Sequence, residues 1–485
     1  MSSNLKTQTF RGLIWTSIQK FGTMLISFVS NIILARLLMP SDYGCIGMLA
    51  IFISVADVIV DGGFGAALIQ KKNPTSEDYS TMFYWNLFLS LALYGLLYLS
   101  APYIARFYNM PILSDLLKVE GIVLIIGGLG MVQRNQLRKN LRFGTFMYIN
   151  LAASILSVIV AIIMAYNGFG VWSLVAQRLV MVGICTLLFV TTNRWRPSFV
   201  FSKKSFKELF SFGSFLLLSN IVNKVSGSIQ GILIGKFYTP ATMGLYSQGG
   251  KLESITAGAM AQVVDQVAYP TLAKLKDDKN AMIAAMRKFK QGIAVVTFPM
   301  MICLIVIAKP LIEILFTAKW LGSAPFFQIL CIAGMASCLQ AINYYVVMSL
   351  GQSKAIFKMT MIRRIIGLGF VIVGFVIGGI WGLMAGMVLS TYFISYTNCV
   401  LVNKYLGYGL WKQVRDLLPI FISAVIAGLS VFIISNWLPF GNIWSKLVVS
   451  ISLFIVVYLA LTYIFKVDSV VNFREYFKMI FRKTK

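Results

Sequence analysis

The stretch LARLLMPSDYG at residues 34–44 returns 200 positions later as IGKFYTPATMG at residues 234–244. In both copies a basic residue precedes a proline, and a glycine stands four positions after that proline. Proline ends a helix and glycine permits a tight turn. A second pair, GVWSLVA at 170–176 and GIWGLMA at 379–385, recurs at nearly the same offset. Two such pairs indicate that one structural unit is duplicated, and each pair marks a turn between two helices.

The composition excludes a soluble enzyme. The 485 residues are 58% hydrophobic and only 12% charged, with a mean hydropathy of +0.80. A soluble protein carries about 25% charged residues, and this much apolar side chain cannot be hidden in a water-soluble core. The chain has no histidine, which removes histidine proton relays, metal sites and catalytic triads. Its six cysteines lie in or beside apolar runs without a CxxC pair, so metal and disulfide interpretations are poor.

Fourteen runs are long enough to cross a bilayer, which takes about 20 apolar residues. They are 12–38, 43–69, 80–106, 111–133, 144–166, 169–192, 209–236, 242–268, 288–307, 322–349, 356–377, 379–402, 415–436 and 444–465. A duplicated unit of six helices accounts for the first twelve. Because six is even, both copies share one orientation, as in transporters whose two halves are parallel repeats.

The sequence therefore predicts an all-α, polytopic membrane protein with 14 transmembrane helices and two six-helix lobes around a central cavity. The divisions that we expect are 1–200 for helices 1–6, 201–405 for helices 7–12, 406–467 for helices 13–14, and 468–485 as an amphipathic helix on the cytoplasmic surface.

The basic residues give the orientation. The chain has 43 Lys and Arg against 16 Asp and Glu. If the N-terminus is cytoplasmic, 32 basic residues fall on the cytoplasmic side and 6 on the opposite side. Cytoplasmic connections carry the excess of Lys and Arg in membrane proteins. We therefore expect both termini in the cytoplasm and interpret the excess of positive charge as topology, with no nucleic-acid partner.

Four segments carry a family resemblance: ILARLLMPSDYG (33–44), VDGGFGAALIQKKNPTSEDYS (60–80), VQRNQLRKNLRF (132–143) and ILIGKFYTPATMGLYSQGGKL (232–252). They resemble Wzx-type polysaccharide flippases, in particular the colanic-acid and teichuronic-acid exporter branch of the multidrug/oligosaccharidyl-lipid/polysaccharide exporter superfamily. The resemblance covers about residues 10–400. It implies two lobes that face each other as a V, and movement of an undecaprenyl-diphosphate-linked sugar repeat across the bacterial inner membrane. Many relatives carry an Asp shortly before the IGKF-type segment, where this chain reads SIQG at 228–231.

Charged residues inside the spans are the candidate functional residues, because each costs about 2.5–3.5 kcal/mol at a helix centre. With a rise of about 1.5 Å per residue, counting from the Pro40 turn places Lys20, Asp57 and Asp61 at similar depth in the cytoplasmic half. The same count from Pro240 places three further residues nearer the bilayer centre; they are Lys224, Lys251 and Glu253. In the resembled family, helices 1, 2, 7 and 8 line the cavity.

Lys20, Lys224 and Lys251 are the candidates for binding the substrate diphosphate, because lysine offers a compact phosphate-binding charge. The alternative is that they only form internal salt bridges, Lys20 with one of two aspartates and Lys224 with Glu253. The carboxylates that could carry a coupling ion or serve as these salt-bridge partners are Asp57, Asp61 and Glu253.

A basic loop cluster is chiefly a topology signal, and it could also attract the diphosphate at the cytoplasmic entrance. Its members are Arg134, Arg138, Lys139 and Arg142. We interpret Arg178, and Lys118 together with Glu120, as structural or interfacial.

The leading hypothesis is a flippase that moves a lipid-linked polysaccharide repeat from the cytoplasmic to the periplasmic leaflet by alternating access. A cation-coupled multidrug exporter of the same superfamily is the alternative, although a cavity biased toward lysine suits cationic substrates poorly. A membrane glycosyltransferase or polymerase is more distant, since the outer connections are short and almost uncharged. A non-transporting scaffold would leave the buried charges unexplained.

We expect no enzymatic activity, cofactor or metal, and the chain lacks the GxxxxGK[ST] loop of ATP-hydrolysing proteins. The expected partners are the lipid-linked oligosaccharide, membrane lipids and other polysaccharide-assembly proteins. We expect a monomer that spans the bacterial inner (cytoplasmic) membrane many times.

Overall fold

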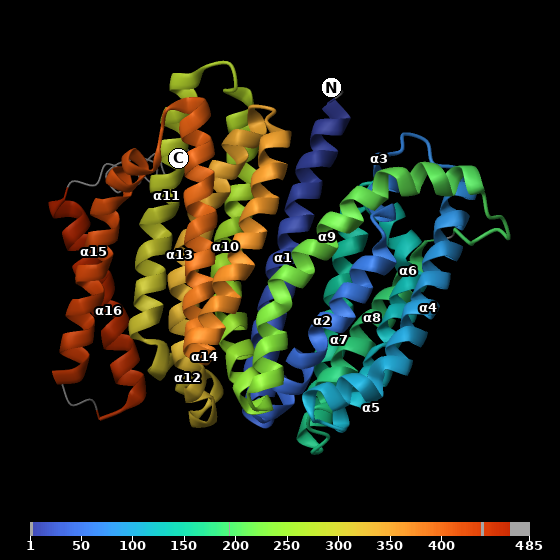
Figure 1. The fold of residues 1–485 in the computed structure, drawn as a ribbon, viewed down its shortest axis with the longest axis horizontal. Coiled ribbons are helices and arrows are strands. Elements are labelled where there is room, and N and C mark those ends of the chain that lie inside the picture. The colour runs from blue at the N-terminus through green and yellow to red at the C-terminus, as the bar shows by residue number, and fades with distance from the viewer. Residues whose placement is uncertain (1–2, 194, 438–440, 466–485) are drawn as a thin grey trace. The chain divides into compact units, whose positions relative to one another are not determined.

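The computed structural model describes residues 3–193, 195–437 and 441–465, and within them every regular element is helical (Figure 1). Ten helical segments of this described part are long and apolar enough to cross a membrane. Large apolar side chains are exposed along them, for example Leu99 at 72% and Ile377 at 82%. An exposed apolar surface of this kind marks contact with lipid. The chain is therefore an all-helical, multi-pass membrane protein; the amphipathic segment expected at 468–485 lies outside the described residues.

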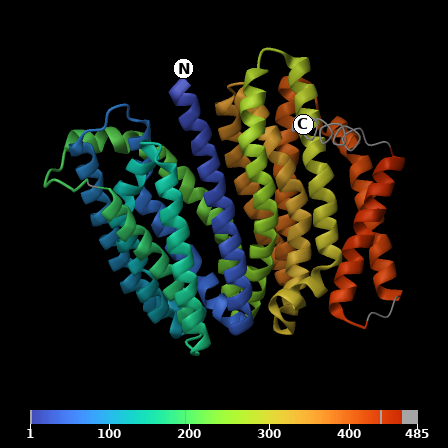
Figure 2. The ribbon, with the colours of Figure 1, turned by 180° about the vertical axis from the view of Figure 1, so that it is seen from behind.

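The chain forms two compact units, Met1–Gly244 and Leu245–Lys485. The helices of the first are α1 (Ser3–Leu37), α2 (Pro40–Asp61), α3 (Phe64–Gln70), α4 (Ser76–Tyr108), α5 (Ile112–Glu120), α6 (Ile122–Lys139), α7 (Phe143–Tyr166), α8 (Trp172–Thr192) and α9 (Lys203–Phe237), followed by the first turn of α10 (Pro240–Lys274). Helix α1 packs on α7, α7 on α8, α4 and α8 on α6, and α9 on α2 (Figure 2). The seventh predicted span thus packs with the helices of the first unit.

Two of the predicted spans are not continuous helices. The run 43–69 breaks at Gly62 and Gly63, whose φ angles of 55° and 72° are left-handed and cannot occur inside an α-helix. The run 111–133 divides at Gly121 into α5 and α6. A side chain on Gly121 would lie 3.1 Å from the ring of Tyr94, so the chain passes closely over α4 at this point.

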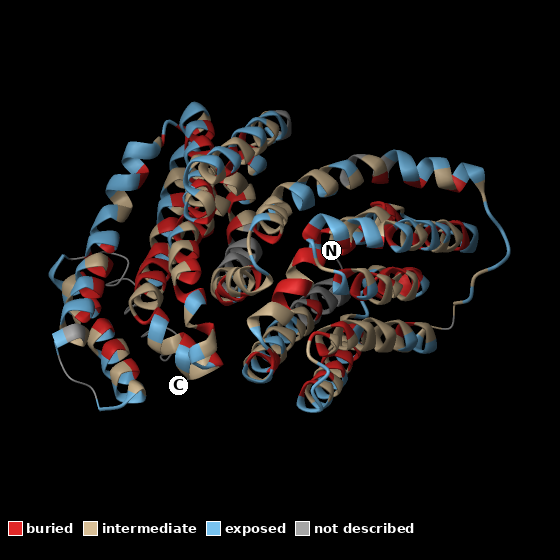
Figure 3. Cartoon of the chain, turned by 60° about the horizontal axis from the view of Figure 1, so that its bottom comes forward, coloured by how far each residue is buried: buried red, intermediate tan, exposed pale blue. Residues whose placement is uncertain are grey.

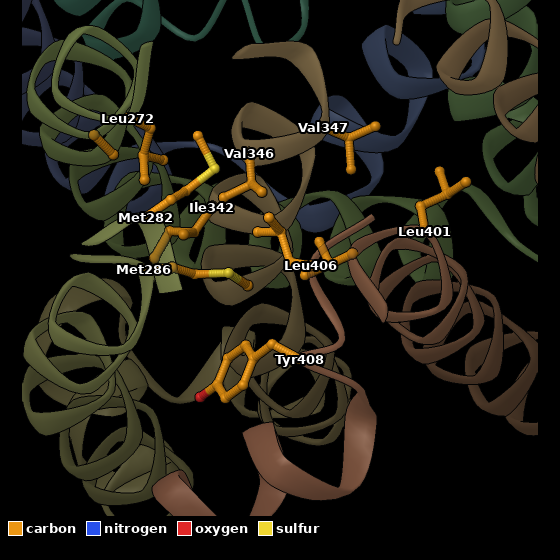
Figure 4. Packing of buried hydrophobic residues seen from close by; sticks show 11 residues of the cluster. Leu272, Met282, Met286, Ile342, Val346, Val347, Leu401, Leu406 and Tyr408 are labelled. Atoms are coloured by element: carbon orange, nitrogen blue, oxygen red, sulfur yellow. The ribbon is translucent and has the colours of Figure 1, made fainter. Parts of the chain in front are cut away.

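The second unit contains the remainder of α10 and seven further elements. They are α11 (Lys279–Val306), α12 (Ala308–Phe316), the 3-10 helix η1 (Ala318–Ser323), α13 (Ala324–Ser349), α14 (Ser353–Leu406), α15 (Leu410–Trp437) and α16 (Ile443–Ile464). In each unit, buried residues lie on the sides that the helices turn toward their neighbours (Figure 3). One core of the second unit joins Leu272 of α10, Met282 and Met286 of α11, and Ile342 and Val346 of α13 (Figure 4).

Helix α14 is two predicted spans joined at a turn. Its 54 residues include the non-helical Gly378 and Gly379, and Gly379 has a left-handed φ of 56°. This turn lies between the predicted runs 356–377 and 379–402. The equivalent residue of the other copy, Gly170, has a φ of 53°. The glycine at the start of this sequence motif therefore has a positive φ in both copies.

The other repeated motif also forms matching turns. Helices α1 and α9 end at Leu37 and Phe237, and α2 and α10 begin at Pro40 and Pro240. A Cβ atom on Gly44 would lie 1.8 Å from the carbonyl oxygen of Pro240, and one on Gly244 would lie 1.8 Å from the carbonyl oxygen of Pro40. Each glycine thus lies against the proline of the other copy, where no side chain would fit.

Candidate functional site

A pocket of about 630 Å³ in the first unit is surrounded by charged side chains from α2, α6, α8 and α9. Most of its remaining lining is apolar, apart from Ser54 and Asn220. We call it the charged pocket, and its charged residues are Asp57, Asp61, Arg134, Arg138, Arg178 and Lys224. With four basic residues against two acidic ones, the lining of the pocket carries an excess of positive charge.

Helix periodicity places these side chains. Asp57 and Asp61 are four residues apart near the end of α2, and Arg134 and Arg138 are four residues apart near the end of α6. Residues at this spacing lie on the same face of a helix. Each helix therefore turns a pair of like charges toward the pocket, and the two pairs are of opposite sign.

Arg178 joins three helices. One guanidinium nitrogen donates to the Asp57 carboxylate at 3.0 Å and the other to Glu120 Oε1 at 2.7 Å. The Glu120 side chain is only 1% exposed, and its other oxygen, Oε2, accepts no hydrogen bond. A buried carboxylate needs such a partner. Arg178 therefore neutralises Glu120 of α5 and fixes α2 and α8 relative to it.

The other basic residues have looser partners. A nitrogen of Arg134 lies 3.7 Å from the Asp61 carboxylate. The Arg138 guanidinium lies 4.8 Å from the ring centroid of Phe146, a cation–π contact. Lys224 is exposed to the pocket, and none of the described carboxylates lies within 4.0 Å of its ammonium. The role of Lys224 in anion binding stays a prediction.

The structure brings together five of the residues predicted from the sequence. The aspartates pair with arginines and not with Lys20, which is exposed on α1 outside the pocket. Lys118 pairs with Asp115 at 3.7 Å and not with Glu120. The five residues that meet in the charged pocket are Asp57, Asp61, Arg134, Arg138 and Lys224.

The basic loop cluster divides into two pairs. Arg134 and Arg138 line the charged pocket, whereas Lys139 and Arg142 do not. The Lys139 ammonium donates to the carbonyls of Leu68 at 2.8 Å and Ile69 at 3.2 Å, and also to that of Lys71. It closes the C-terminal end of α3, and burial there lowers the pKa of Lys139. Arg142 is exposed just before α7.

Lys251 and Glu253 belong to the second unit, where both lie on α10. Lys251 is exposed and Glu253 is half-buried. A Cβ atom on Gly334 would lie 2.8 Å from Glu253 Oε1, so the glycine makes room for this carboxylate beside α13. The predicted salt bridge between Lys224 and Glu253 would join the two units and stays a prediction.

Arg178 is the residue of this site that the sequence interpretation undervalued. Its charge interrupts an apolar run, and this was the signal in the sequence that could have marked it as functional. The sequence did not show its partners, Asp57 and Glu120, because they lie on other helices, α2 and α5. No group of three or more metal-ligating side chains occurs among the described residues.

Comparisons with known proteins agree with the motifs. A teichuronic acid biosynthesis protein of Bacillus subtilis (strain 168) is 29% identical over 356 residues, which cover 73% of this chain and 74% of that protein. The lipopolysaccharide biosynthesis protein WzxC of Escherichia coli (strain K12) is 22% identical over 455 residues, 93% of this chain and 89% of that one.

Solved structures show the same fold. The lipid II flippase MurJ, in an inward closed conformation, has a TM-score of 0.75 at 16% identity and covers 94% of this chain and 100% of its own. An inward-facing multidrug resistance MATE family transporter has a TM-score of 0.57 at 15% identity, covering 84% of this chain and 98% of its own.

The family described as polysaccharide biosynthesis protein matches residues 33–325. This range is more than half of the chain and includes the four segments that carry the resemblance. The prediction of a Wzx-type relationship is confirmed, and the chain belongs to the polysaccharide biosynthesis protein family.

Proposed function

We propose that this protein moves an undecaprenyl-diphosphate-linked polysaccharide repeat unit from the cytoplasmic to the periplasmic leaflet of the bacterial inner membrane by alternating access. The observation that carries the proposal is the charged pocket, in which basic residues outnumber acidic ones. A diphosphate that leaves water without fixed counter-charges loses several kcal/mol of solvation per ion. Relatives named for teichuronic acid and lipopolysaccharide biosynthesis support this class of substrate.

Each pocket residue has a distinct role in this proposal. Lys224 receives the diphosphate, because its exposed ammonium has no described carboxylate within 4.0 Å; Arg138 also has none, but its guanidinium lies over the ring of Phe146. Arg134 and Arg138 attract the anion into the pocket, and Arg178 positions Asp57. Phosphate binding by several fixed cations needs no metal or cofactor.

The remaining sequence predictions enter the proposal as further positions along the path. Lys20 and Lys251 contact the diphosphate before or after it occupies the charged pocket. Coupling to an ion is assigned to the carboxylates that could release a proton or bind Na⁺; they are Asp57, Asp61 and Glu253. Lys139 holds α3 in place, which leaves Arg142 as an exposed charge at the entrance.

The proposed topology has 14 spans, both termini in the cytoplasm and two six-helix lobes related as a parallel repeat. Three observations support it: the matching ends of α1 and α9, the similar positive φ of Gly170 and Gly379, and the turn within α14. The distribution of basic residues supports the orientation. A cation-coupled multidrug exporter has a similar fold but a weaker structural likeness, and an excess of arginine and lysine in the pocket disfavours cationic substrates.

The test is flipping of a lipid-linked oligosaccharide by purified protein in liposomes. Lys224→Ala should lower the rate at least tenfold, and Lys224→Arg should retain part of it. Lys207→Ala is the matched control, because Lys207 is an exposed lysine of the same helix outside the pocket. Equal rates for the wild type and Lys224→Ala would show that the diphosphate is handled elsewhere. Absence of flipping by the wild type, with transport of a cationic drug, would favour the exporter.

A further inference from the structure

A second cation without a counter-ion lies deep in the other unit. The Lys290 residue on α11 is 3% exposed, and its ammonium donates to Gln413 Oε1 on α15. The same oxygen accepts from the Cys399 thiol at 3.2 Å. No carboxylate among the described residues lies within 4.0 Å of the Lys290 ammonium. Asp416, on the same helix as Gln413, pairs with Arg287 at 2.7 Å. A buried charge without an opposite charge is unfavourable, so this position suits an anion.

Lys290 lies at one end of an apolar cavity of about 510 Å³ enclosed by α11, α13, α14 and α15. Phe298 lies eight residues beyond Lys290 on α11, and Phe421 lies eight residues beyond Gln413 on α15. At about 1.5 Å per residue the cavity extends about 12 Å along these helices. Half of a typical hydrocarbon core is about 15 Å. The cavity therefore has a cationic end and an apolar length close to one leaflet.

The lining of the cavity reaches the apolar outer surface at α14 and α15. Tyr392 and Tyr396 on α14 are 43% and 49% exposed, and Leu418 and Phe421 on α15 are 45% and 38% exposed. These residues line the cavity and also form part of the apolar outer surface. A molecule already dissolved in the bilayer can enter between them without crossing water.

We propose that this cavity binds an anionic glycerophospholipid of the surrounding membrane, with its phosphate at the Lys290 ammonium and one acyl chain between α14 and α15. The proposal is independent of the charged pocket and of the transported substrate. A phospholipid fits better than a free phosphate, because the cavity behind the cation is lined by aromatic and aliphatic side chains. An anionic headgroup fits better than a zwitterionic one, since a nearby second cation would oppose Lys290.

Native mass spectrometry of the full chain tests this proposal. The protein is released from micelles that contain either phosphatidylglycerol or phosphatidylcholine, and the bound lipids are counted. Wild type should retain one phosphatidylglycerol with at least tenfold preference over phosphatidylcholine. Lys290→Met should lose this preference, and Lys290→Arg should keep it. Lys288→Met, an exposed lysine two residues away on the same helix, should bind like the wild type.

A second variant tests the acyl-chain position separately. Ala336 lines the cavity from α13 and is 6% exposed, so Ala336→Phe should fill the cavity and abolish retention while Lys290 stays in place. Unchanged phosphatidylglycerol retention in both Lys290→Met and Ala336→Phe would overturn the proposal. Equal retention of phosphatidylcholine, or displacement of phosphatidylglycerol by one equivalent of polyprenyl phosphate, would overturn the assignment to an anionic phospholipid.

Discussion

Replacing Arg178 by methionine should expose how strongly the charged pocket depends on one side chain. The substitution removes the partner of Glu120, whose side chain is 1% exposed, and of Asp57, whose side chain is 46% exposed. Breaking a fully buried pair costs about 3–5 kcal/mol, and breaking an exposed pair costs up to about 1 kcal/mol. The Arg178 side chain is 32% exposed. We therefore expect Arg178→Met to lower the free energy of unfolding by an amount between these limits, about 2–3 kcal/mol.

Removing the charge of Glu120 as well should recover much of the stability that Arg178→Met loses. In the double variant Arg178→Met, Glu120→Gln no ionised group is left buried without a partner, so the two changes should be coupled by about 2 kcal/mol. The assay is unfolding of the purified protein with a denaturing detergent, followed by tryptophan fluorescence, for the two single variants and the double variant.

The control for the three variants is Lys118→Met, which removes the partner of Asp115, a carboxylate on α5 whose side chain is 70% exposed. It should change stability by less than about 1 kcal/mol. Additive effects of Arg178→Met and Glu120→Gln would refute the reasoning, because they would show that the 2.7 Å contact contributes no pairwise energy. A loss in Arg178→Met as small as that in Lys118→Met would do the same.

Two further predictions concern the backbone and the topology. Gly44→Ala should destabilise by about 3 kcal/mol, because the added Cβ would lie 1.8 Å from the carbonyl oxygen of Pro240, a backbone atom that cannot turn away as a side chain can. Gly95→Ala, where an added Cβ has nothing within 4 Å, should not destabilise in the same unfolding assay. Single cysteines that replace Asn167 and Gly378 should react with a membrane-impermeant reagent added on the periplasmic side. A cysteine that replaces Lys485, which lies outside the described residues, should not react. The opposite pattern would reverse the proposed orientation.

Local rules determined which segments become helices. Each of the fourteen apolar runs overlaps a described helix, because an apolar run in a bilayer must satisfy its backbone hydrogen bonds internally. The turns at Pro40 and Pro240 and at Gly170 and Gly379 were also predictable, because proline and glycine act on their own backbone. The breaks at Gly62, Gly63 and Gly121 were missed, since hydropathy alone does not detect a left-handed residue or a close crossing.

Only the tertiary structure decided which charges meet. The sequence placed Asp57 and Asp61 at the depth of Lys20, but depth does not say which faces of the helices turn toward one another. Packing of α2 against α6 and α8 brings the aspartates to Arg134 and Arg178 instead.

The same reason separates residues that are neighbours in the sequence. Arg138 and Lys139 differ by about 100° around α6, so the first lines the charged pocket and the second binds the carbonyls that end α3. Lys290 is one of the 32 basic residues expected on the cytoplasmic side from the sequence, yet its helix buries it at an apolar cavity. Hydropathy is a property of each residue, whereas pairing depends on helix rotation, which is fixed by contacts between residues far apart in the chain.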